Sequence, residues 1–174
     1  MIEIDKVLKN ISHTPVELPN VFVEGLTNNS SKVKKGFIFF ALKGENIDGN
    51  DFIEEAFNNG ACLVVSDSDK VISQRNIIKV DNVRLASGVA CSNFYNFPQN
   101  KLKLIGITGT NGKTSTSSIL KSILDNADIK ALQVGTSGIK PKLDVETNLT
   151  TPDIFDLYHI FNMAVKQDYE YIIL

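Results

Sequence analysis

The sequence is poor in cysteine and has no pattern that would bind a metal through it. Its two cysteines, Cys62 and Cys91, stand among apolar residues and are spaced neither as CxxC pairs nor with histidines. Reduced, buried thiols are the ordinary state of such residues. We therefore expect no disulfide and no cysteine-based metal site.

Strong net charge and long apolar runs are also missing. The formal net charge is −2, so no electrostatic argument supports nucleic-acid binding. No run approaches the roughly 18 apolar residues that a membrane-spanning helix needs. The N-terminus lacks the basic and apolar regions of a secretory signal. These absences predict a cytoplasmic protein that binds neither nucleic acid nor membrane, and we expect it to be a monomer.

No arrangement of residues suggests a nucleophilic triad, because the two histidines, His13 and His159, are isolated. His159 has apolar neighbours on a predicted helix, which is typical of a packing or surface histidine. Any catalysis is therefore expected to work without a nucleophilic side chain.

The hydrophobic pattern divides the chain near residue 100. The first part alternates apolar segments typical of buried strands with segments of helical periodicity. The predicted strands are 36–42, 61–65 and 77–80, and the predicted helices are 51–59 and 83–95. The second of these helices is expected to turn Leu85, Val89 and Phe94 inward. The turn-rich residues 96–100 mark the boundary, so we predict a domain at 1–98 and the start of another at 99–174.

The second part reads strand, glycine-rich loop, helix, strand, loop or small hairpin, helix, strand. The predicted elements are strands at 102–107 and 131–134, a hairpin within 135–148, helices at 113–125 and 151–167, and a final strand at 169–174. The first helix has an apolar stripe of Ile119, Leu120, Ile123 and Leu124. Thr151 is the expected N-cap of the second helix, with Pro152 in its first turn. This alternation predicts a parallel sheet. Because chains rarely stop within a core strand, we expect a segment of a longer protein.

A phosphate-binding loop, or P-loop, follows the strand at 102–107. Glycines let backbone N–H groups converge on phosphates, and a helix N-terminus there favours negative charge. A lysine can reach the β- and γ-phosphates, and the next hydroxyl can bind Mg²⁺. The predicted ATP-binding residues are Gly109, Thr110, Asn111, Gly112, Lys113, Thr114 and Ser115. Lys113 and Thr114 are the predicted catalytic residues, and Thr114 is the predicted metal ligand. The spacing is unusual, because Ile107 stands where the general pattern has its first glycine.

Several segments together resemble one family. Residues 106–114 resemble the ATP-binding signature of the Mur ligases, which depart from the general P-loop in the same way. Residues 36–44 and Asp48-Gly49 resemble the N-terminal uridine-nucleotide domain of that family, and Arg84-Leu-Ala86 resembles its run into the ATPase domain. Thr150-Thr-Pro-Asp153 resembles a motif of the member that adds the third residue of the peptidoglycan stem peptide. The resemblance covers nearly the whole chain.

The resemblance implies an α/β fold, with a small N-terminal uridine-nucleotide domain followed by the first part of a parallel-sheet P-loop ATPase domain. It implies a ligase that uses ATP and Mg²⁺ to join an amino acid, meso-diaminopimelate or L-lysine, to a UDP-N-acetylmuramoyl-dipeptide through an acyl phosphate. By the same resemblance Ser30, Glu45 and Asn46 lie beside the uridine nucleotide, while Thr150 and Thr151 contact the UDP-muramoyl-peptide. The family commonly has Asp-Ser-Arg where this chain has Asn29-Ser30-Ser31, so the hydroxyl is kept and the flanking charges are not.

The family's remaining catalytic parts would follow Leu174: a glutamate for a second Mg²⁺ contact, a modified lysine and a third domain. We therefore expect this chain alone not to catalyse ligation. Three other interpretations stay open, namely another kind of P-loop enzyme, a different Mur-type ligase, and a non-catalytic module that binds a UDP-sugar.

Overall fold

The computed structural model describes residues 2–69, 76–135, 138–143 and 152–174. The chain folds into two compact units, Met1–Phe94 and Tyr95–Leu174. Each unit is built around a sheet that is wholly or mostly parallel, which confirms the predicted α/β class.

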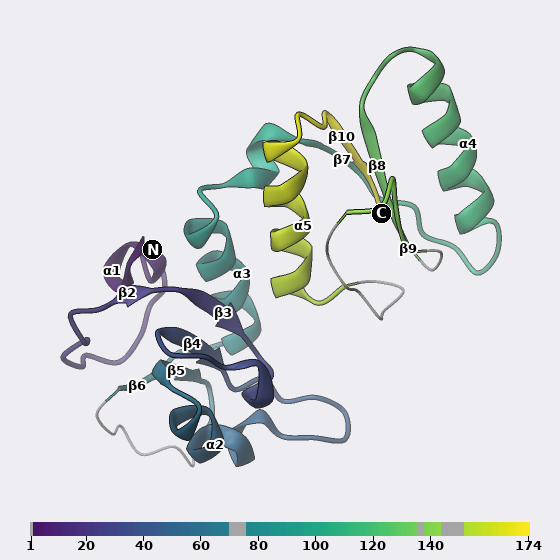
Figure 1. Ribbon diagram of the computed structural model, residues 1–174. Coiled ribbons are helices and arrows are strands. Elements are labelled where there is room, and N and C mark those ends of the chain that lie inside the picture. The colour runs from purple at the N-terminus through teal and green to yellow at the C-terminus, as the bar shows by residue number, and fades with distance from the viewer. Residues whose placement is uncertain (1, 70–75, 136–137, 144–151) are drawn as a thin grey trace. The chain divides into compact units, whose positions relative to one another are not determined.

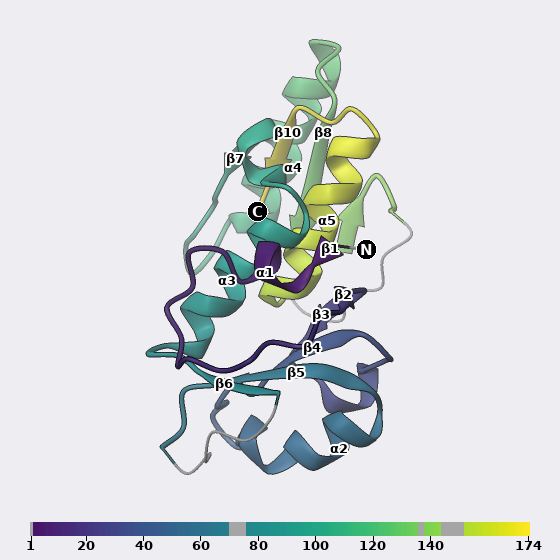
Figure 2. The ribbon, with the colours of Figure 1, turned by 90° about the vertical axis from the view of Figure 1, so that its left-hand side faces the viewer.

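The sheet of the first unit has four parallel strands. Its order is β3 (Gly25–Thr27), β4 (Phe37–Phe40), β5 (Ala61–Ser66) and β6 (Ile77–Lys79). Figures 1 and 2 place α2 (Ile53–Asn58) on one side of this sheet and α3 (Val83–Phe94) on the other. Strands covered on both faces need continuous apolar runs, and Ile38 to Phe40 and Leu63 to Val65 are accordingly buried. The three strands predicted in this unit are confirmed, whereas β3 was not predicted.

Helix α3 turns small side chains inward, and the prediction for Leu85 is wrong. Leu85 is 71% exposed, whereas Ala86, Ala90 and Cys91 are buried. The short helix α1 (Ile4–Val7), which lies beside the two-stranded pair β1 (Ile2–Glu3) and β2 (Phe22–Val23), packs against α3. A hydrogen bond stabilises the contact between α1 and α3: Asn93 Nδ2 donates to the carbonyl of Val7 at 3.0 Å. Small residues on α3 let the two helices approach closely.

The sheet of the second unit has the order β7 (Lys103–Ile105), β10 (Tyr171–Ile173), β8 (Ala131–Gly135) and β9 (Gly138–Lys140). The first three strands are parallel, and β9 forms the predicted hairpin with β8. Helices α4 (Lys113–Asn126) and α5 (Ile154–Lys166) lie on opposite sides of the sheet in Figure 1. The core combines Leu132 and Ile172 of the sheet with Ile160, Phe161 and Ala164 of α5.

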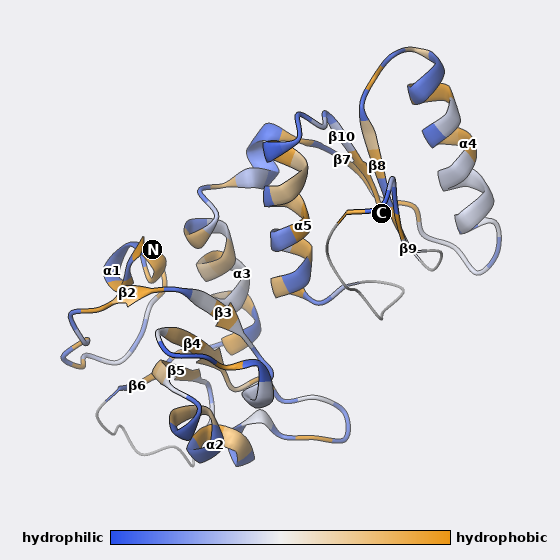
Figure 3. Cartoon of the chain, in the orientation of Figure 1, coloured by the Kyte–Doolittle hydropathy of each residue, from blue (hydrophilic) through white to orange (hydrophobic). Residues whose placement is uncertain are grey.

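The two helices differ from their predictions in detail. The N-cap of α5 is Asp153, whose Oδ1 accepts from the backbone N–H groups of Phe155 and Asp156 at 2.9 Å each. The prediction of Thr151 as N-cap is therefore wrong. In α4, Ile119 and Ile123 are 62% and 59% exposed, so only part of the predicted stripe faces the sheet. Figure 3 shows the difference in composition: the first turns of α4 are pale, whereas α5 alternates orange and blue.

In the part of the chain that the structure describes, no helix is both long enough and apolar enough to cross a membrane.

Candidate functional site

The predicted P-loop lies between the end of β7 and the start of α4. Pairing with β10 continues beyond β7, because the N–H of Ile107 donates to the carbonyl of Leu174 at 2.7 Å. The chain then turns through Gly109, with φ +155°, and Gly112, with φ +80°. L-residues rarely adopt these values, so glycine at both positions permits the turn that brings the loop to the helix end.

The helix that follows the loop supplies the electrostatics expected of a phosphate site. Gly112 is the N-cap of the 14-residue α4, and its carbonyl accepts the first helical bond from the N–H of Thr116 at 2.9 Å. The amides of Lys113, Thr114 and Ser115 therefore precede the intrahelical ladder, at the positive end of the helix dipole. An anion at this end would be stabilised by both features.

The lysine of the loop is placed beside the glycine turn. The Nζ of Lys113 donates to the carbonyl of Gly109, so the ammonium group lies over the loop and not in bulk solvent. Residues 109–112, 114 and 115 are exposed and Lys113 is partly buried. The structure thus brings all seven predicted ATP-binding residues into one accessible loop at a helix N-terminus, an arrangement that fits a nucleotide phosphate chain with its Mg²⁺.

A second candidate site is a cavity of about 490 Å³ in the first unit. It lies where β3 and β4 end, at the carboxyl edge of the parallel sheet, which is the usual place for a ligand in such folds. The segment after β3 contributes Asn28, Asn29 and Ser30, and the segment after β4 contributes Leu42, Lys43, Gly44, Ile47, Gly49 and Phe52; Phe39 and Arg84 complete the lining.

Ser30 lines this cavity with an oriented hydroxyl. Its side chain is held at the start of a 3-10 helix (Ser30–Lys32) that Asn29 caps by accepting from the N–H of Ser31 at 3.0 Å. The Ser30 Oγ donates to Glu55 Oε2 of α2 at 2.9 Å. Since the hydroxyl proton is committed to the carboxylate, the Ser30 oxygen can act toward a ligand only as an acceptor.

Glu45 and Asn46 lie at the exposed tip of the turn next to the cavity. The turn closes where the N–H of Gly44 donates to the carbonyl of Ile47 at 2.9 Å. Gly44 and Ile47 line the cavity, whereas Glu45 and Asn46 are not among the lining residues. Their role as nucleotide contacts stays a prediction.

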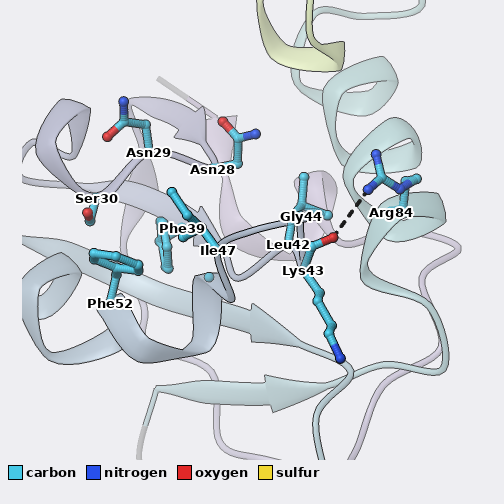
Figure 4. Close-up of a pocket in the computed structure, with 11 residues that line it drawn as sticks. Asn28, Asn29, Ser30, Phe39, Leu42, Lys43, Gly44, Ile47, Phe52 and Arg84 are labelled. Carbon is cyan, nitrogen blue, oxygen red and sulfur yellow. Dashed lines mark hydrogen bonds between the residues drawn. The ribbon is translucent and has the colours of Figure 1, made fainter.

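The cavity has two chemically different ends, as Figure 4 shows. Ser30 and Phe52 lie at one end and Arg84 at the other. Among the described residues that line the cavity, Lys43 and Arg84 are basic and none is acidic. The guanidinium of Arg84 donates to the carbonyl of Lys43 at 3.5 Å, which joins α3 to the turn after β4. Sequence reasoning noticed Arg84 only as part of a motif and did not assign Phe52 or Asn28 to the site.

Thr150 and Thr151, the other predicted substrate contacts, lie outside the described residues. Within the described ranges, no group of three histidine, cysteine or acidic side chains could hold a metal ion.

Comparison with known proteins identifies both halves of the chain. The Mur ligase family, catalytic domain, matches residues 22–95, and the Mur ligase middle domain matches residues 107–174. The UDP-N-acetylmuramoyl-L-alanyl-D-glutamate–2,6-diaminopimelate ligase of Caldanaerobacter subterraneus is 40% identical over 97% of this chain and 35% of its own length. The ligase of the same name from Fusobacterium nucleatum is 39% identical over 87% of this chain and 31% of its own.

Solved structures agree with these relatives. A structure of a UDP-N-acetylmuramoyl-L-alanyl-D-glutamate–2,6-diaminopimelate ligase superimposes with a TM-score of 0.77 at 25% identity, over 99% of this chain and 36% of that one. The MurF ligase of Thermotoga maritima in complex with ADP gives a TM-score of 0.55 at 25% identity, over 86% of this chain and 31% of that one. This chain spans about a third of the length of the curated relatives it matches. By its two domain matches, its relatives and its P-loop, the chain belongs to the Mur ligase family.

Proposed function

We propose that this chain provides the UDP-substrate domain, residues 1–98, and the start of the ATP-binding domain, residues 99–174, of an ATP-dependent ligase. The ligase would join 2,6-diaminopimelate to UDP-N-acetylmuramoyl-L-alanyl-D-glutamate during peptidoglycan synthesis. The names of the relatives support diaminopimelate over L-lysine. The observation that carries the proposal is the P-loop at the N-terminus of α4, with Lys113 beside the Gly109 turn.

The P-loop would bind the phosphates of ATP through its backbone and Lys113. The amides at the start of α4 and the helix dipole would stabilise the phosphate charge, and the ammonium group would exchange the Gly109 carbonyl for phosphate oxygens. Mg²⁺, held by the Thr114 hydroxyl together with phosphate oxygens, would neutralise further charge. The ADP complex of the Thermotoga maritima ligase, which shares the fold, supports a nucleotide at this loop.

The cavity of the first unit would hold the uridine nucleotide. Its Ser30 and Phe52 end offers an acceptor oxygen and an aromatic ring, which suit a base that carries an N–H donor. Its Arg84 end, with a guanidinium group, suits the diphosphate. Contacts from Glu45, Asn46, Thr150 and Thr151, a monomeric state and a cytoplasmic location remain predictions.

The reaction needs no nucleophilic side chain from this chain. The substrate carboxylate would attack the γ-phosphorus of ATP and release ADP, giving an acyl phosphate. The amine of the incoming amino acid would then displace phosphate, form the amide and lose a proton. Such a transfer depends on positioning and on charge stabilisation, which the loop, the helix end and Lys113 supply. We expect residues 1–174 alone to bind ligands without ligating them.

Calorimetry with the 174-residue chain tests this proposal. ATP with Mg²⁺ should bind, and Lys113→Ala should weaken it about 10- to 100-fold, since a charge-assisted hydrogen bond contributes about 1.5–3 kcal/mol. Lys130→Ala is the control, because Lys130 is exposed and follows the far end of α4, so this change should leave ATP affinity unchanged.

UDP-N-acetylmuramoyl-L-alanyl-D-glutamate should bind to the same chain, independently of Lys113. Binding of this ligand with no binding of ATP would favour a non-catalytic UDP-sugar module. Absence of uridine-nucleotide binding would refute the ligase assignment.

A further inference from the structure

A buried polar contact joins β8 to the P-loop helix. Gln133 is 3% exposed and Ser117 of α4 is 8% exposed. The Gln133 Nε2 donates to Ser117 Oγ at 2.7 Å and lies 3.3 Å from Ser118 Oγ. The neighbours of Gln133 on the strand, Leu132 and Val134, point to the opposite face of the sheet and pack with α5, so Gln133 is the side chain of this stretch that faces α4.

The contact continues to the residue predicted to bind Mg²⁺. The Ser117 hydroxyl donates to the backbone carbonyl of Thr114 at 2.9 Å. Because that proton is used, the Ser117 oxygen is the acceptor for Gln133. Residues three apart lie on the same face of a helix, so the chain of bonds runs from the sheet through Ser117 to the first turn of α4.

Apolar packing alone leaves the position of this helix weakly defined. Ile119 and Ile123 are largely exposed, and the other apolar residues of the predicted stripe, Leu120 and Leu124, are only partly buried. Apolar contacts are not directional, whereas a hydrogen bond fixes both distance and direction. The hydrogen bond between the Gln133 amide and the Ser117 hydroxyl therefore fixes the rotation of α4 about its axis and its position along β8.

We propose that Gln133 and Ser117 are positioning residues that hold the first turn of α4, and through it Thr114, in the orientation needed to bind Mg²⁺ beside the nucleotide phosphates. The proposal rests on the proposed function of the P-loop. It explains why a buried strand position carries an amide where valine or leucine would pack without a polar cost.

The test compares nucleotide affinity with Mg²⁺ and with EDTA in the 174-residue chain. In Gln133→Met and in Ser117→Ala the gain in ATP affinity from Mg²⁺ should fall about tenfold, as is usual when the partner of a metal-holding group is lost. The loss of affinity in EDTA should be smaller than the loss with Mg²⁺, because Lys113 and the loop glycines, which contact phosphate without a metal, are unchanged. Ser117→Thr, which keeps the hydroxyl, should restore the Mg²⁺ gain.

Ser118→Ala is the matched control, since Ser118 Oγ also accepts from Gln133 Nε2, at 3.3 Å, whereas the bond to the Thr114 carbonyl comes from Ser117. It should keep the wild-type gain. Hydrogen exchange without ligand gives a second measurement: the amides of residues 116 and 117 should exchange faster in Gln133→Met and Ser117→Ala than in Ser118→Ala. Should Gln133→Met fail to fold, Ser117→Ala and Ser117→Thr carry the comparison.

An unchanged Mg²⁺ gain in folded Ser117→Ala would overturn the proposal. Equal losses with Mg²⁺ and with EDTA would also overturn it, because they would indicate a general structural role. A wild-type chain that binds no ATP would instead refute the proposed function of the loop. That outcome differs from one in which the wild type binds ATP and the variants show the same Mg²⁺ gain as the wild type, which would refute only the positioning role.

Discussion

Replacing Gly49 by alanine should damage the first unit and its cavity together. Gly49 is buried, and its N–H donates to the carbonyl of Leu42 at 3.0 Å. An added Cβ would lie 2.7 Å from the Leu42 oxygen and 2.8 Å from Leu42 N and Ala41 C. All three are backbone atoms at the end of β4, so no side-chain rotation can relieve the contact. Overpacking costs about 1–3 kcal/mol, and weakening the hydrogen bond adds about 1 kcal/mol.

We therefore expect Gly49→Ala to lower the free energy of unfolding of this unit by about 2–4 kcal/mol. Urea unfolding should be followed by amide exchange of β4 as well as by circular dichroism, because two units need not unfold as one transition. Gly49 and Leu42 both line the cavity, so the affinity for a uridine nucleotide should fall as well.

The control for this prediction is another glycine in the same unit. A Cβ on Gly88, within α3, would have no atom within 4 Å. Gly88→Ala should therefore stabilise the unit by about 0.5–1 kcal/mol, through helix propensity and reduced freedom of the unfolded chain. Neutral surface substitutions change the free energy of unfolding by up to about 0.5 kcal/mol. If Gly49→Ala changes it by no more than that, the added Cβ does not clash with the Leu42 and Ala41 backbone as we expect.

Three further predictions concern single contacts. Glu55→Ala should weaken uridine-nucleotide binding by calorimetry about 2- to 10-fold, because the Ser30 hydroxyl loses its acceptor and with it a fixed orientation; unchanged affinity would exclude Ser30 as an oriented acceptor. Asp153→Ala should cost about 1 kcal/mol of thermal stability through loss of the α5 cap, while Asp153→Ser should retain most of it. The hydrogen bond from Lys79 lowers the pKa of Asp69 below its ordinary value. The stability from this pair should thus be complete above the unfolded-state pKa and lost as pH falls through the folded-state pKa. An NMR titration of Asp69 that is unaltered by Lys79→Met would contradict this.

Much of the fold follows from the sequence because its strands are continuous apolar runs. The segments at β4 and β5 are buried on both faces, and such runs are distinctive. Strand β3 is only Gly25–Thr27, too short and too mixed to stand out. The prediction that Leu85 is buried failed because a periodicity argument assigns large apolar residues to the core. In the structure α3 contacts α1 closely and buries the small residues Ala86 and Ala90 instead. That choice depends on a neighbouring helix that the local pattern cannot reveal.

The two candidate sites differ in the same way. The predicted P-loop is one contiguous segment whose residue types follow from phosphate chemistry, so the sequence alone was enough to predict it. The cavity collects Ser30, Phe52 and Arg84 from three separate elements. The Ser30 hydroxyl was expected from a family resemblance. The positions of Arg84 and Phe52 at the two ends of the cavity depend on the folded structure, which brings these separate elements together. The turn tip at Glu45 and Asn46 was singled out by its place in the motif, and the structure shows it exposed.

Helix α4 shows how a buried polar contact can displace a periodicity prediction. The apolar stripe centred on Ile119 and Ile123 is the expected core face, yet the residues turned toward the sheet include buried Ser117 and Lys121, whose side chain is only 14% exposed. At about 100° per residue, the direction midway between Ile119 and Ile123 lies roughly 160° around the helix from the direction midway between Ser117 and Lys121. A helix placed only by hydrophobic burial would turn the isoleucines inward. The hydrogen bond from Gln133 to Ser117 fixes a different rotation, so a polar contact decides which face of α4 meets the sheet. Local conflicts of this kind are expected at functional sites.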